Sequence, residues 1–117
     1  MEDEVYAVLS GAAAVTAIVG SGIYLARMEQ GAALPALVFQ RISTTPSSTL
    51  SGINPTTRAR LQVDAWAETF AEADALAAAA RAALLLSKSI WLDQRYLFEN
   101  DTRVHRVSMD FSVWYQL

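Results

Sequence analysis

The 117-residue sequence contains no cysteine, a single histidine and few charged side chains. The absence of cysteine excludes disulfide bonds, thiolate metal sites and cysteine nucleophiles, and it suits assembly in a reducing cytoplasm. Charged residues make up 18% of the chain, below the usual quarter, and the formal net charge is −3. The sequence therefore lacks the basic surface with which proteins grip nucleic acid.

Apolar residues are abundant, at 53% of the chain. The length is that of one domain with one core, so we expect a single domain spanning residues 1–117. A small domain has a large surface to cover with polar groups. The apolar excess therefore suggests additional burial against partner molecules.

One uncharged stretch, residues 5–26, is long enough to span a bilayer. Gly11, Gly20 and Gly22 interrupt it, and the preceding acidic residues 2–4 are unlike the positive start of a signal peptide. We therefore expect no membrane segment, and a membrane-anchored protein is kept as an alternative.

The first half of the chain indicates one helix and two strands. Apolar residues recur at three- and four-residue steps over residues 3–19, with an acidic start that suits the helix dipole and a Gly-Ser-Gly stop at residues 20–22. Residues 23–25 are consistent with a short strand. Residues 36–43 are rich in branched and aromatic side chains, which favours a second strand.

Residues 44–57 are dense in turn formers and long for a hairpin loop. We expect a protruding arm that reaches a neighbouring molecule, with Pro46, Leu50 and Ile53 as its candidate contact residues. A connector without a role is the alternative.

The second half of the chain indicates a strand, a helix and a hairpin. Polar and apolar residues alternate over residues 58–67, and Thr69 followed by Glu72 matches a capping box before an alanine-rich helix. Residues 90–98 and 104–116 are predicted strands joined by a turn at 99–102. The pattern predicts an α+β fold, with a mostly antiparallel sheet of four to five strands packed against two α-helices.

Three runs in this order resemble the siphophage tail-completion proteins, also called tail terminators or head–tail joining proteins. They are LPALVFQRIS at residues 34–43, RARLQVDAWA at 58–67 and RVSMDFSVWY at 106–115. The N-terminal helix followed by the Gly-rich residues 19–24 is similar as well.

The resemblance implies a structural role and no catalytic residues, cofactor or metal site. The family's subunits form a hexameric ring that caps the tail tube, stops its polymerisation and faces the head connector. Expected partners are therefore further copies of this chain, the tail tube protein and the head–tail connector or stopper protein. The expected location is the virion, after assembly in the bacterial cytoplasm. Six copies of charge −3 would carry about −18, so DNA would pass through the lumen without specific binding.

Two other functions were weighed against this one. A head-side adaptor or stopper of the portal–tail neck would fit the same patterns. A small-ligand binding domain or accessory enzyme would need convergent polar groups, which the sequence does not offer. His105, with Asp101 and Asp110 nearby, is a poor metal or catalytic site, and we expect it on the solvent face of its strand.

Large aromatic and cationic residues occur on the polar faces of two predicted strands. Trp66 and Trp114 lie there near strand ends, where an aromatic side chain caps a sheet edge or anchors an interface, and we favour an interface. Arg58, Arg60 and Arg106 share these faces. They are either ordinary solvated charges or partners of acidic residues on an adjacent subunit.

The strand at residues 36–43 is apolar on both faces. Leu37 and Phe39 lie on one face, and Val38 and Ile42 lie on the other. Such a strand must be covered twice, so we predict Leu37 and Phe39 as interface candidates for a neighbouring subunit.

Overall fold

The computed structural model describes residues 1–28, 31–46 and 56–116, and the side chains of Pro46, Thr56 and Gln116 are not included. It contains three helices and five strands and confirms the α+β prediction. In chain order these are α1 (Glu2–Gly11), α2 (Ala13–Val19), β1 (Ile23–Leu25), β2 (Ala36–Pro46), β3 (Thr56–Ala67), α3 (Phe70–Leu85), β4 (Ser89–Glu99) and β5 (Val104–Gln116).

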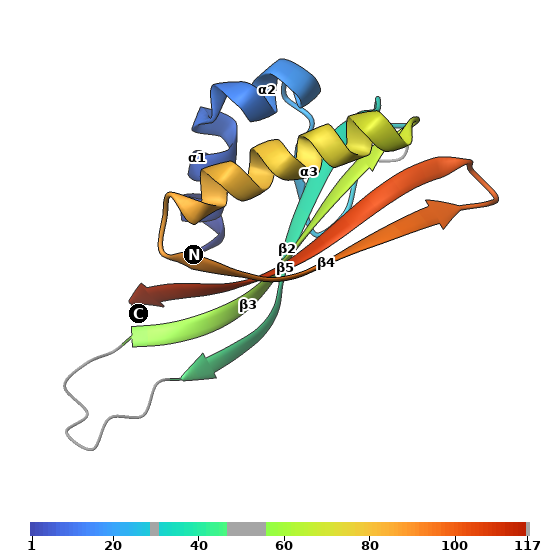
Figure 1. Ribbon diagram of the computed structural model, residues 1–117. Coiled ribbons are helices and arrows are strands. Elements are labelled where there is room, and N and C mark those ends of the chain that lie inside the picture. The colour runs from blue at the N-terminus through green and yellow to red at the C-terminus, as the bar shows by residue number, and fades with distance from the viewer. Residues whose placement is uncertain (29–30, 47–55, 117) are drawn as a thin grey trace.

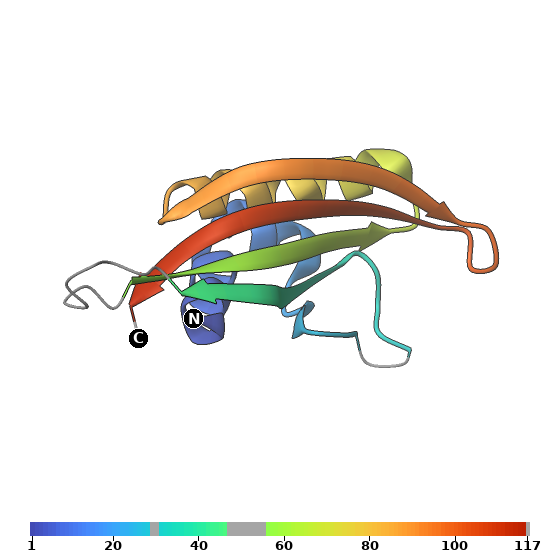
Figure 2. The ribbon, with the colours of Figure 1, turned by 90° about the horizontal axis from the view of Figure 1, so that it is seen from below.

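The strands form one twisted sheet in the order β1-β2-β3-β5-β4 (Figure 2). All neighbouring pairs are antiparallel except β1 and β2, which are parallel. The pairing of β3 with β5 runs without a register shift from Thr56 opposite Gln116 to Ala67 opposite His105. The two central strands are therefore fixed along their whole length, and β4 forms one edge of the sheet.

The N-terminal helix predicted over residues 3–19 is divided in two at Ala12, whose backbone is extended (φ −86°, ψ 113°). This break explains why there are three helices and not the two expected. In one straight helix, Val15 would point about a third of a turn away from Leu9. The break turns α2 so that Val15 and Leu9 are both completely buried in the same core.

All three helices lie on one face of the sheet (Figure 1), and the core fills the space between them. The Thr69 side chain accepts a hydrogen bond from the backbone N–H of Glu72 at 3.2 Å, as expected of the helix N-cap. The buried residues of α3 include Ala73, Leu76 and Leu84. Phe70, the first residue of the helix, is 52% exposed.

The connection predicted at residues 44–57 is shorter in the structure. β2 continues to Pro46, and Thr44, Thr45 and Pro46 pair with residues 57–59 of β3. Leu50 and Ile53, two of the candidate contact residues, lie outside the described residues. Within the described residues, no helix is long and apolar enough to cross a membrane.

Candidate functional site

The face of the sheet opposite the helices, here called the helix-free face, brings together four of the predicted interface residues. Arg58 lies opposite Trp114, and Arg106 lies opposite Trp66, in the register of β3 and β5. The guanidinium carbon is 5.6 Å from the ring centroid in the first pair and 5.0 Å in the second. Both distances are within the range of a cation–π interaction, so each tryptophan is held by a cross-strand arginine.

Between these pairs, a charged cluster surrounds Asp110, which is only 5% exposed. Arg60 Nη2 lies 2.9 Å and Arg95 Nη1 lies 3.3 Å from the same Asp110 oxygen. Arg95 Nη1 also donates to Asp93 at 2.8 Å. The hydrogen bond to Asp110, followed by its charge, raises the pKa of Arg95, so this guanidinium stays protonated wherever the protein is folded.

The hypothesis that Arg60 pairs with an acidic residue of an adjacent subunit is therefore revised, because Arg60 already has an intrachain partner in Asp110. Charge reversal at Arg60 would place a carboxylate beside the buried Asp110 and destabilise the subunit itself. That substitution cannot separate assembly from folding.

Asp110→Ala is expected to destabilise the subunit more than Arg60→Ala does. Removal of Asp110 leaves Arg60 without its acidic partner and leaves Arg95 with Asp93 alone, at a cost of about 1–3 kcal/mol. Removal of Arg60, which is half exposed, leaves Asp110 with Arg95 as its partner. Urea unfolding of the two variants measures the difference. Equal stabilities would contradict the role of Asp110 as the shared centre.

Leu37 and Phe39, predicted at an interface, are buried in the core of the subunit, at 0% and 1% exposure. Their side chains face the helices, which cover this half of the strand within one chain. The prediction that a neighbouring subunit covers them is therefore corrected.

The most exposed apolar surface lies on β4, which the sequence analysis did not single out. Six large apolar side chains of this edge strand are between 39% and 54% exposed. They are Ile90, Trp91, Leu92, Tyr96, Leu97 and Phe98. The sequence signal was the lack of polar and apolar alternation over residues 90–98, since apolar residues fall on both faces of the strand. These six residues are called the apolar edge below.

A groove of about 660 Å³ runs between α3 and β4 on the helix side of the apolar edge. The Arg81 guanidinium carbon lies 4.5 Å from the centre of the Trp91 ring, and Arg81 Nη1 donates to Gln94 Oε1 at 2.8 Å. Gln94 Nε2 donates in turn to the Tyr96 hydroxyl at 2.7 Å. This chain of contacts fixes the groove wall, so the groove is shaped before any partner binds.

His105 was expected on the solvent face of its strand, but it lies on the helix side. Its ring centroid is 4.8 Å from that of Phe98 and 6.2 Å from that of Phe70. His105 therefore belongs to an aromatic cluster at the end of the groove. Among the described residues, no group of three or more His, Cys, Asp or Glu side chains could hold a metal ion.

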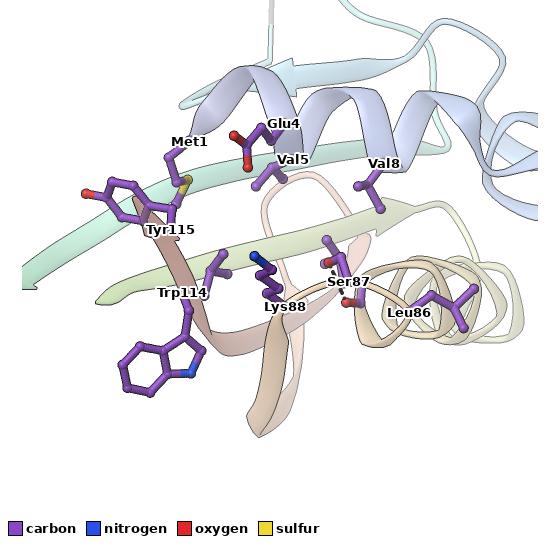
Figure 3. A pocket seen from close by; sticks show the side chains of 11 residues that line it. Met1, Glu4, Val5, Val8, Leu86, Ser87, Lys88, Trp114 and Tyr115 are labelled. Atoms are coloured by element: carbon purple, nitrogen blue, oxygen red, sulfur yellow. Dashed lines mark hydrogen bonds between the residues drawn. The ribbon is translucent and has the colours of Figure 1, made fainter. Parts of the chain in front are cut away.

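A second hollow of about 630 Å³ lies where the start of α1 meets the end of α3 and of β5 (Figure 3). Its walls include Val5 and Val8, and its polar side chains include Glu4, Ser87 and Lys88. Ser87 Oγ donates to a backbone carbonyl, that of Leu84, at 2.8 Å. The lining contains no nucleophile paired with a base, which is what a hydrolytic site requires.

Comparisons with known proteins found a matching family and a solved structure with the same fold. A family model described as tail completion protein gp17 matches residues 3–116. Among solved structures, a chain of the "Virion of native gene transfer agent (GTA) particle" superposes with a TM-score of 0.74 at 18% sequence identity. The match covers 97% of this chain and 92% of that chain, which shows a shared fold. The comparison with curated proteins gave no match.

Proposed function

The chain belongs to the tail completion protein gp17 family, and from this membership we propose that it is a tail terminator. As a member of the family it is a structural protein located in the tail of a phage virion. In the proposed role, copies of the chain form a ring, expected to contain six, that caps the tail tube. The ring ends polymerisation of the tube and joins the tail to the head connector.

The observation that carries the proposal is the family match, which extends over nearly the whole chain. Two features of the subunit support a role in assembly and not in catalysis. The apolar edge exposes six large side chains on a single strand, more than an isolated small domain normally leaves in water. The residues lining the two hollows described above offer no catalytic pair.

The partners in this proposal are further copies of the chain, the tail tube protein and the connector or stopper of the head. A net charge of −3 per copy makes the ring acidic, so DNA would pass through without being held. A head-side adaptor or stopper of the portal–tail neck is the alternative, and the experiment below separates the two roles.

Electron microscopy of a lysate from phage that lack this gene tests the proposal. A terminator predicts DNA-filled heads separated from tails of uncontrolled length, and a plasmid copy of the gene should restore joined particles. Tails of normal length beside heads that have lost their DNA would assign the protein to the head side. Intact infectious particles would contradict both roles.

A further inference from the structure

The apolar edge is an unusual edge strand. Natural sheets protect their edges with short strands, charged side chains, proline or bulges. β4 has eleven residues and no proline, and although it carries the charged residues Asp93, Arg95 and Glu99, six of its residues are large and apolar. Its one register irregularity lies between Trp91 and Asp93, where Leu92 has no partner in the register with β5. The Leu92 side chain is half exposed. The unpaired backbone N–H and C=O groups of this edge can form hydrogen bonds with a strand of another molecule, and the apolar side chains can be buried against it.

The sheet has a second open edge, on β2. β1 pairs only with Leu37 to Phe39, and the last backbone bond on this side runs from the Ala26 N–H to the Phe39 carbonyl. Among the described strands, none pairs with the outer side of residues 40–46. This segment is polar apart from Pro46, which has no backbone N–H to donate, and Ile42, which is 49% exposed at the register irregularity of β2 between Arg41 and Ser43. The two open edges therefore differ in chemistry, one apolar and one mostly polar.

The directions of the two edge strands are compatible. β2 is antiparallel to β3, β3 to β5, and β5 to β4, so β2 and β4 run in opposite directions within one sheet. A second copy that continued the sheet beyond β4 would therefore present its β2 antiparallel to β4. This is the same pairing that joins the long strands within the chain.

In such a continued sheet, the helices of the two copies would lie on the same side, next to each other across the contact between β4 and β2. Glu2 of α1 forms an ion pair with Arg41 of β2 at 3.0 Å, so α1 borders the β2 edge. Tyr6 lies one turn after Glu2 on the same side of α1, and its side chain is 47% exposed. In a continued sheet, Tyr6 of the second copy would approach the groove between α3 and β4.

We propose that β4 pairs with residues 40–46 of a second copy of this chain, so that the sheet continues from one subunit to the next. This inference rests on the proposed ring. The six apolar-edge residues and Phe70, at about half exposure each, represent on the order of 600 Å² of side-chain surface. That is most of the roughly 800 Å² that each partner contributes to a stable interface.

Pairing of β4 with β4 is the competing arrangement. It would be symmetric and would end at a dimer, with both β2 edges unused. Contact between two different edges is head-to-tail and repeats from copy to copy, and it forms a ring when the rotation between copies closes. The difference in chemistry between the edges favours the second arrangement.

Disulfide trapping can distinguish these arrangements because the chain has no cysteine of its own. Ser43→Cys is combined in turn with Ile90→Cys, Asp93→Cys, Leu97→Cys and Glu99→Cys, which sample different registers on the helix-free face. Within one chain β2 and β4 are separated by three strand spacings of about 4.8 Å, too far for an internal disulfide. The variants are supplied to the gene-deleted phage, and purified particles are oxidised and run on a non-reducing gel.

At least one double variant is expected to give a ladder of covalent oligomers that ends at the ring size, while Ser43→Cys alone stays monomeric. The four β4 cysteines are also tested one at a time, and dimers from any of these single variants would overturn the proposal in favour of β4–β4 pairing. Joined particles without a ladder in any of the four double variants would overturn it as well. In both cases the joined particles would leave the terminator role intact, whereas that role fails if the gene-deleted phage forms normal particles, or tails of normal length beside heads that have lost their DNA.

Discussion

Replacement of Phe39 by alanine is expected to lower the free energy of unfolding by about 3–5 kcal/mol. The Phe39 side chain is 1% exposed and packs in the core between β2 and the helices. Its removal leaves a cavity that the surrounding sheet cannot close, since β2 is held by β3 along its length. Urea unfolding followed by circular dichroism measures the loss.

Ile42→Ala provides a matched control on the same strand. Ile42 lies three residues after Phe39, and its side chain is 49% exposed. Its truncation should cost less than about 1 kcal/mol, as is usual for surface substitutions. If Phe39→Ala kept its stability and lost only assembly, Phe39 would be an interface residue after all.

The sequence of helices and strands along the chain was predictable because β2, β3, β4 and β5 each carry a local sequence signal. The alternation of Val107, Met109 and Phe111 with polar residues located β5 and assigned its buried face. The same alternation places His105 on that face, and the expectation of a solvent-facing histidine overlooked it. The division of the first helix at Ala12 had only a weak signal, the preceding Gly11, because one glycine lowers helix propensity without ending a helix, and Ala12 and Ala13 favour a continuous one.

The pairing of tryptophans with arginines was not predictable from local pattern. Trp66 and Arg106 are 40 residues apart, and their contact depends on the register between β3 and β5. A shift of one residue in that register would have moved every side chain to the opposite face. The sequence could therefore indicate that these residues lie on polar strand faces, but not which of them meet.

The burial of Asp110 also depends on long-range contacts. It lies on the helix-free face, where solvent exposure was expected, yet Arg60 of β3 and Arg95 of β4 close over it.

The apolar edge was not predicted for a related reason. Residues 90–98 show no alternation, so the pattern located a strand without indicating which side is buried. The strand order shows that β4 is an edge strand with apolar residues exposed on both faces, and the local sequence pattern cannot show this.

Leu92→Asp is expected to abolish assembly and leave the free subunit folded. Leu92 is half exposed at the bulge of β4, and it lines a small hollow that also contains Arg58 and Arg60. These guanidinium groups can accommodate a carboxylate in the isolated subunit, so its stability should change by less than about 1 kcal/mol. Against a second copy the same carboxylate would be desolvated, at a cost of about 3 kcal/mol per contact, or roughly 100-fold in affinity.

Leu86→Asp is the matched control, because Leu86 is 92% exposed at the end of α3 and lies outside β4. Both variants are supplied to the gene-deleted phage, and joined particles are counted in the electron microscope while urea unfolding checks the purified subunits. Loss of joined particles with Leu92→Asp alone assigns assembly to the β4 edge, because the two variants carry the same new charge. Equal loss with both variants would trace the effect to that charge, and normal particles with Leu92→Asp would exclude the β4 edge from the ring.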